Sequence, residues 1–280
     1  MVPARAVALL VATVAVALPA AAPGQDKAAP AVRKHADIAY RSDPAADPDR
    51  HKLDLYVPSG EKNFPVLFFV HGGTWRSGNK GMYVALGEAF AKLGIGTVVI
   101  NYRLSPAVKH PAHVEDVAKA FAWTRENVGK YGGDKEKITL FGHSAGGHLV
   151  SLLATDPAYL KAENLTPAAV RGVVSVSGVY SIAPELPLFH PIFGTDEKVC
   201  RLASPLSHVT GKQPPFLLAY GDKDFDHLDR MALDMAAALK KYDSPHTVMK
   251  CEGRNHYSII MLSIQPDDTL HKAIRDFATR

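Results

Sequence analysis

The sequence predicts an α/β fold: a mostly parallel central sheet flanked by helices on both faces. Three observations predict it. Short apolar or β-branched runs alternate with longer segments of helical periodicity, which is the order of elements in a parallel sheet covered on both faces. The 280 residues are 47% hydrophobic, enough for a large sheet core. Glycine-rich turns follow several apolar runs, at the positions where such sheets bind ligands.

The first 24 residues differ from the rest of the chain. Arg5 precedes an apolar run over 6–18, and small residues cluster over 20–24. This order is typical of a secretory signal peptide, and the run is too short to span a bilayer comfortably. We expect a signal peptide at 1–24, a single domain over 25–280, a secreted or periplasmic protein, and no stable membrane insertion after signal removal.

The sheet is expected to begin with a hairpin. Two strands, 37–41 and 52–57, flank a turn rich in Asp and Pro, and the stretch 25–35 before them is expected to be mobile. Runs rich in apolar and β-branched residues predict the further strands, in chain order, at 66–70, 97–101, 137–141, 172–176, 216–220 and 247–251.

Helices are expected in the intervals between these strands. Apolar residues at helical spacing predict a helix over 82–93 that stops at Gly94, and one over 114–131 that stops at Gly132. The same spacing predicts further helices over 145–154, 228–241 and 270–279. The segment 177–212 breaks the alternation, is rich in Pro, Phe and Leu, and is predicted to be a short cap or lid insertion.

The strongest chemical signal is Gly142-His143-Ser144-Ala145-Gly146-Gly147, between the strand over 137–141 and the next helix. A nucleophilic serine needs its hydroxyl exposed on a sharp turn, and flanking glycines permit the strained backbone and the close approach of strand and helix. The helix that follows presents free amides and a positive dipole end. Ser144 is therefore the predicted nucleophile.

A second glycine turn, His71-Gly72-Gly73-Thr74-Trp75, follows the strand over 66–70. Acyl transfer passes through a tetrahedral intermediate with a negative oxygen, which backbone amides must approach closely. The amides of Gly72, Gly73 and Ala145 are the predicted oxyanion hole.

An acid and a histidine follow the last two predicted strands. Asp222, Asp224 and Asp226 lie in one loop after 216–220, and His256 follows 247–251. The chain order Ser, Asp, His is one that serine hydrolases use. The competing His246 precedes its strand and so is expected at the wrong end of the sheet.

Taken together, these motifs resemble the α/β-hydrolase superfamily, and within it the esterases and lipases with an HGG motif. The resemblance spans about 37–280 and rests on 71–75, 101–106, 142–149, 203–206, 221–224 and His256. It implies a catalytic set of Ser144, Asp224 and His256, because Gly221-Asp222-Lys223-Asp224 is similar to the superfamily's Gly-x-x-Asp pattern.

The resemblance is to small carboxylesterases and also to kynurenine formamidase, through His71–Trp75 and Ser177-Gly178-Val179-Tyr180. It implies a serine carboxylic-ester hydrolase that forms an acyl-enzyme on a small-molecule ester, a carbohydrate ester being one candidate. The alternatives are an arylformamidase-type amide hydrolase and a non-catalytic, hydrolase-like binding protein.

Other classes find little support in the sequence. The net charge of +4 is spread along the chain without a basic block, so no nucleic-acid partner is expected, and neither a metal nor another cofactor is indicated. Export would permit a disulfide between Cys200 and Cys251, which is left open. Each of five aromatic side chains is expected in the core rather than in a substrate pocket: Trp75, Tyr180, Phe189, Phe193 and Phe225.

Overall fold

The computed structural model of the chain describes residues 30–280, so the expected signal peptide at 1–24 lies outside the described residues. The strands are β1 (Val32–Ala39), β2 (Lys52–Pro58), β3 (Phe64–Val70), β4 (Gly96–Ile100), β5 (Gly133–His143), β6 (Gly172–Val176), β7 (Phe216–Lys223) and β8 (His246–Asn255). Within the described part of the chain they form one sheet in the order β1-β2-β4-β3-β5-β6-β7-β8. β2 runs antiparallel to both its neighbours, and the other pairs are parallel.

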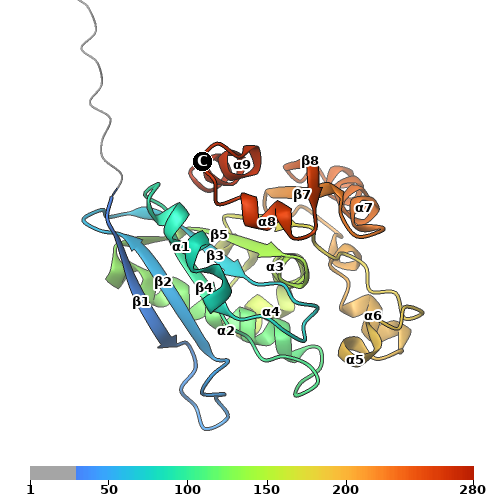
Figure 1. Cartoon of the computed structure of the whole chain (residues 1–280). Coiled ribbons are helices and arrows are strands. Elements are labelled where there is room, and N and C mark those ends of the chain that lie inside the picture. The colour runs from blue at the N-terminus through green and yellow to red at the C-terminus, as the bar shows by residue number, and fades with distance from the viewer. Residues whose placement is uncertain (1–29) are drawn as a thin grey trace, which may run out of the picture.

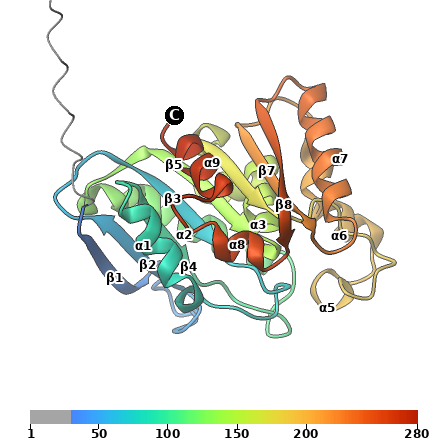
Figure 2. The same ribbon diagram turned by 45° about the horizontal axis from the view of Figure 1, so that its top comes forward.

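Helices cover both faces of this sheet, as Figures 1 and 2 show. They are α1 (Val84–Ala91), α2 (Ala112–Asn127), α3 (Ala145–Thr155), α4 (Pro157–Ala162), α5 (His190–Phe193), α6 (Glu197–Leu202), α7 (Leu228–Lys241), α8 (Ser258–Leu262) and α9 (Thr269–Ala278). α1 and α9 pack on one face, and α2, α3 and α7 on the other. The predicted mostly parallel sheet with helices on both faces is confirmed.

The apolar runs of the central strands explain the two-sided core. Successive side chains of a strand point to opposite faces. In β3, Val66, Phe68 and Val70 therefore join the core under α2 and α3, whereas Leu67 and Phe69 join the core under α1 and α9. A strand buried on both faces reads as a continuous apolar run, as this one does.

The strand register brings distant glycine turns to one edge of the sheet. Val70, the last residue of β3, pairs with Gly142 near the end of β5. Lys223, the last residue of β7, pairs with Asn255 at the end of β8. Because parallel strands share a direction, the loops that follow β3, β5, β7 and β8 all open at this edge.

Three expectations in the first half of the chain need correction. The stretch 25–35 was expected to be mobile, but β1 already begins at Val32, where the backbone pairs with Pro58 of β2. The single helix expected over 82–93 is a 3-10 turn, Lys80–Tyr83, followed by the shorter α1. The helix expected over 114–131 is α2, which already ends at Asn127. A single 3-10 turn follows it and stops at Gly132, whose φ of 93° requires glycine.

The segment 177–212 contains α5, α6 and the 3-10 turn Pro205–His208. Its apolar side chains pack into the core on the side of α3, including Tyr180, Phe189, Ile192, Phe193 and Cys200. Cys251 lies in the core on the other face of the sheet. Both cysteines are therefore buried free thiols, held apart by the sheet. Within residues 30–280 no helix has the length and apolarity to cross a membrane.

Candidate functional site

Ser144 lies on a strained turn between β5 and α3. Its φ of 56° and ψ of −120° are costly for a residue with a side chain. A Cβ on Gly142 would lie 2.3 Å from the Gly146 carbonyl oxygen, and one on Gly146 would lie 1.9 Å from the Val70 carbonyl oxygen. Only glycine fits at either position, so the motif's glycines bring α3 against the ends of β3 and β5.

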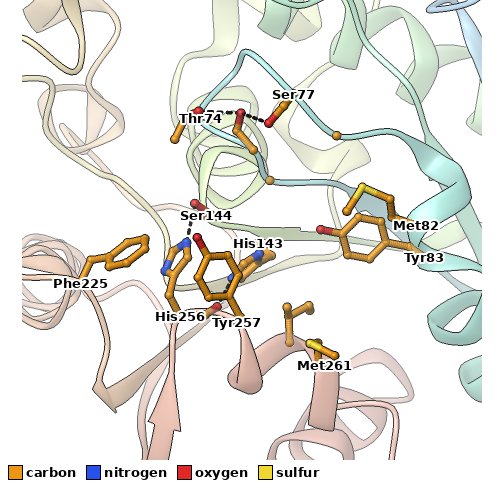
Figure 3. Close-up of a pocket in the computed structure, with 14 residues that line it drawn as sticks. Thr74, Ser77, Met82, Tyr83, His143, Ser144, Phe225, His256, Tyr257 and Met261 are labelled. Atoms are coloured by element: carbon orange, nitrogen blue, oxygen red, sulfur yellow. Dashed lines mark hydrogen bonds between the residues drawn. The ribbon is translucent and has the colours of Figure 1, made fainter.

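The structure brings Ser144, His256 and Asp224 into one chain of hydrogen bonds, of which Figure 3 shows the link between Ser144 and His256. His256 Nε2 lies 2.9 Å from Ser144 Oγ, and His256 Nδ1 lies 2.7 Å from Asp224 Oδ1. A carboxylate only accepts, so Nδ1 carries a proton and Nε2 is free to accept the serine proton. The serine is 9% exposed and the histidine 6%, so the chain is shielded but reachable.

The carboxylate of Asp224 has a full set of donors. Oδ2 accepts from Ser177 Oγ at 2.5 Å and from the Gly221 amide at 3.3 Å, and Oδ1 accepts from the Phe225 amide at 2.9 Å. Burial raises the pKa of this carboxyl, but hydrogen bonds from His256, Ser177 and Phe225 outweigh burial and lower it. Asp224 therefore remains ionised and can orient the imidazole.

The competing candidates lie elsewhere. Asp222 and Asp226 are exposed, and Asp222 accepts from the Arg254 amide at 3.0 Å. His246 begins β8, the strand whose other end leads to His256, so it lies at the opposite edge of the sheet. The imidazole that reaches Ser144 is that of His256, and the carboxylate behind it is that of Asp224.

His143 supports the histidine loop from the nucleophile turn. Its Nε2 lies 2.8 Å from the His256 carbonyl oxygen, and since a carbonyl only accepts, His143 is the donor. Burial lowers the pKa of His143 to about 3, so this side chain is neutral in ordinary buffers. Sequence reasoning did not assign it a contact with the histidine loop.

The glycine turn after β3 lies beside the serine. A Cβ on Gly72 would lie 3.0 Å from Ser144 Cβ, and Gly73 has a φ of 115°. Both glycines line the same pocket as Ser144 and His256. Ala145 opens α3, where first-turn amides have no partner within the helix. The three residues whose amides the sequence predicts as the oxyanion hole are thus neighbours of Ser144.

The pocket has a volume of about 480 Å³ and is open to solvent. Figure 3 shows Thr74 and Ser77 on one side of Ser144, Met82 and Tyr83 on a second, and Tyr257 and Met261 on a third. Of its lining residues within the described chain, none is Asp, Glu, Lys or Arg. The pocket therefore suits a neutral molecule with an apolar part.

Sequence reasoning missed most of the side chains that line this pocket. The pocket side chains it did not single out are Ser77, Met82, Tyr83, Tyr257, Ile260 and Met261. Of the five aromatic side chains expected in the core, Trp75, Tyr180, Phe189 and Phe193 are buried there. Phe225 is 54% exposed and lines the pocket. Its position directly after Asp224 was the available signal.

Metal-ligating side chains do not gather into a group of three or more anywhere in residues 30–280. What the site contains is a hydroxyl, an imidazole and a carboxylate in series, beside a glycine turn and the first turn of α3. That arrangement can activate an alcohol as a nucleophile and stabilise a negative oxygen.

Curated relatives of the chain are esterases. It is 36% identical over 177 residues to a probable carboxylic ester hydrolase, LipM, of Mycobacterium tuberculosis, covering 57% of this chain and 41% of the relative. It is 33% identical over 230 residues to esterase LipQ of the same organism, covering 76% and 54%. The chain thus spans about half the length of the curated relatives it matches.

Solved structures with the same fold include a truncated carbohydrate esterase from gut microbiota, with a TM-score of 0.76 at 22% identity over 90% of this chain and 97% of that one. Esterase B from Lactobacillus rhamnosis matches with a TM-score of 0.72 at 22% identity over 88% and 85%. These likenesses confirm the α/β-hydrolase fold. The sequence model of the BD-FAE family matches residues 53–227, more than half of the chain, and the protein therefore belongs to the BD-FAE family.

Proposed function

We propose that the protein is a serine carboxylesterase that cleaves a small, neutral ester through an acyl-enzyme. The observation that carries the proposal is the series Ser144 Oγ, His256 and Asp224, with distances of 2.9 and 2.7 Å. The names of the relatives, esterase and carboxylic ester hydrolase, support it.

In the proposed reaction Ser144 Oγ attacks the ester carbonyl while His256 Nε2 takes the hydroxyl proton. The carbonyl electrons move onto its oxygen, which the amides of Gly72, Gly73 and Ala145 stabilise. The tetrahedral intermediate collapses, the C–O bond to the alcohol breaks, and His256 gives its proton to the leaving oxygen. Water, deprotonated by His256, then repeats these steps on the acyl-enzyme and releases the acid.

The ester is proposed to be small and uncharged, with an acetylated carbohydrate as one natural class. The uncharged lining of the pocket and its volume of about 480 Å³ support a small neutral ester. A carbohydrate is supported by one structural neighbour, which is itself named a carbohydrate esterase. Export of the domain 25–280 after removal of a signal peptide at 1–24 is part of the proposal and fits a substrate outside the cytoplasm.

The first test is hydrolysis of p-nitrophenyl acetate, butyrate and octanoate by the purified protein and by Ser144→Ala. Wild type is expected to prefer acetate or butyrate, and the variant to lose kcat by about a million-fold, or to background. An N-formyl aryl amide and acetylated sugars complete the panel.

Equal, slow rates for wild type and Ser144→Ala would contradict the serine mechanism and favour a binding protein. Turnover of the formyl amide without turnover of any ester would favour an arylformamidase instead.

A further inference from the structure

Trp75 ends the glycine turn after β3, residues 71–75 (the oxyanion turn), and is buried, with 2% of its surface exposed. Its ring packs edge-on against Phe193, at 5.1 Å between ring centroids, and against His148 at 5.0 Å. The indole Nε1 donates to His148 Nδ1 at 3.2 Å. The tryptophan is thus fixed both by its ring contacts and by a directional hydrogen bond.

His148 belongs to the first turn of α3, and its amide donates to the Ser144 carbonyl oxygen at 3.0 Å. Its Nε2 lies 2.8 Å from the carbonyl oxygen of Ala203, which can only accept. Nε2 therefore carries the proton, and Nδ1 is left as the acceptor that Trp75 needs. One fully buried imidazole thus joins the oxyanion turn, the helix α3 and the segment 177–212.

The oxyanion turn has a conformation that needs such support. Gly73, Thr74 and Trp75 have successive φ angles of 115°, 53° and 59°. A residue with a side chain is strained in this region of φ, and it keeps such a conformation only where its surroundings hold it. The Trp75 carbonyl is also held, by the Ser105 amide at 2.9 Å.

Resting on the proposed function, we infer that the hydrogen bond from Trp75 to His148 sets the distance between the amides of the oxyanion turn and the nucleophile Ser144. Trp75 and His148 are positioning residues. Neither is among the residues that line the pocket, so they act on the reaction through the backbone they hold.

The protonation of His148 fits this role. Burial lowers the pKa of His148 to about 3, and the hydrogen bond with Ala203 only partly offsets that effect. The imidazole is therefore neutral in ordinary buffers, and its Nδ1 keeps the lone pair that accepts from Trp75.

The test compares Trp75→Phe, which keeps an aromatic ring but removes the N–H, with wild type in p-nitrophenyl ester hydrolysis. Displaced amides stabilise the transition state less and leave substrate binding intact. We therefore expect kcat to fall by about tenfold or more with KM nearly unchanged. The Ki of a trifluoromethyl ketone, which forms an oxyanion on the serine, should rise by a similar factor.

A second pair of variants separates the hydrogen bond from packing. His148→Asn keeps an acceptor near Nδ1 and is expected to retain more kcat than His148→Phe, which keeps only a ring. Tyr180→Phe is the matched control, because it removes another buried hydrogen bond in the same core, to Ser175 Oγ at 2.7 Å, away from the oxyanion turn. It should lower Tm and leave kcat near the wild-type value.

The inference is overturned if Trp75→Phe lowers Tm alone, or if His148→Asn and His148→Phe lose the same kcat. Wild-type turnover that disappears in Ser144→Ala is measured first. If wild type shows no turnover that depends on Ser144, that result contradicts the proposed function rather than the role of Trp75.

Discussion

At the scale of single residues, hydrogen-bond partners distinguish the site residues from their neighbours of the same type. Asp224 accepts from Ser177, Gly221, Phe225 and His256, whereas its neighbour Asp226 is exposed. Four donors keep the carboxylate ionised and fix its direction. The carboxylate in turn selects the histidine tautomer whose Nε2 faces the serine.

Asp224→Asn should therefore lower kcat by about 10⁴-fold with little change in KM, because an amide can donate to His256 Nδ1 and favour the wrong tautomer. The measurement is steady-state hydrolysis of p-nitrophenyl butyrate. Asp226→Asn makes the same chemical change two residues away and should retain wild-type kcat. Equal losses in the two variants would contradict the choice of Asp224.

The sequence indicated where the catalytic residues lie, but it did not indicate all the residues that form the site. Ser144, Asp224 and His256 each follow a strand, so the fold alone placed them at one edge. The pocket wall could not be found in this way, because Met82 and Met261 are far apart in sequence and carry no chemical signal. Only the packing of the 3-10 turn Lys80–Tyr83 and of α8 brings these two side chains to one opening.

Among the elements, the contact between β3 and α3 is the one on which the site geometry depends most. Gly146 lies against the carbonyl of Val70, directly before the oxyanion turn. The helix α3 and the oxyanion turn are thus in contact through backbone atoms. Unlike side chains, these atoms cannot change rotamer to relieve a steric clash.

Gly146→Ala should destabilise the protein by about 3 kcal/mol, since its Cβ would lie 1.9 Å from the Val70 carbonyl oxygen and one backbone must move. Urea unfolding measures the change. Gly129→Ala is the control, because nothing lies within 4 Å of a Cβ there, and it should change stability by less than about 1 kcal/mol. A Gly146→Ala protein as stable as wild type would show that this contact is not tight.

Strands and long helices were predictable from their sequence patterns, and short helices were not. The predicted bounds 172–176 and 228–241 match β6 and α7. The helices α4, α5, α6 and α8, of four to six residues, were missed. A helix of one turn or so shows too little periodicity to be recognised, and tertiary packing rather than propensity stabilises it.

For the whole molecule, buried and half-buried neutral histidines couple stability to pH. Burial lowers the pKa to about 4 for His71, His110 and His113, and to about 3 for His143 and His148. These side chains lie at the ends of β3 and β5, at the start of α2 and in α3, so their titration is tied to the folding of the domain rather than to one loop.

Each of these histidines has a pKa near 6.5 when unfolded, so below that pH the unfolded chain binds more protons than the folded one. Their contribution to stability is complete above pH 6.5 and is lost as pH falls toward 4. The carboxyl of Asp224, whose pKa is lowered on folding, acts in the same direction at lower pH. Because domains are stable by only about 5–15 kcal/mol, we expect unfolding before pH 4 is reached.

Urea unfolding at pH 7, 6, 5 and 4.5 tests this expectation, and the midpoint should fall at each step. His113→Asn removes one such titration at a residue outside the pocket. It should be less stable than wild type at pH 7, because a buried ring is lost, yet lose less stability between pH 7 and pH 5. A wild-type midpoint that stays constant over that interval would mean that these histidines bind protons in the fold as readily as in the unfolded chain, and the assignment of His143 and His148 as neutral hydrogen-bond partners would fail with it.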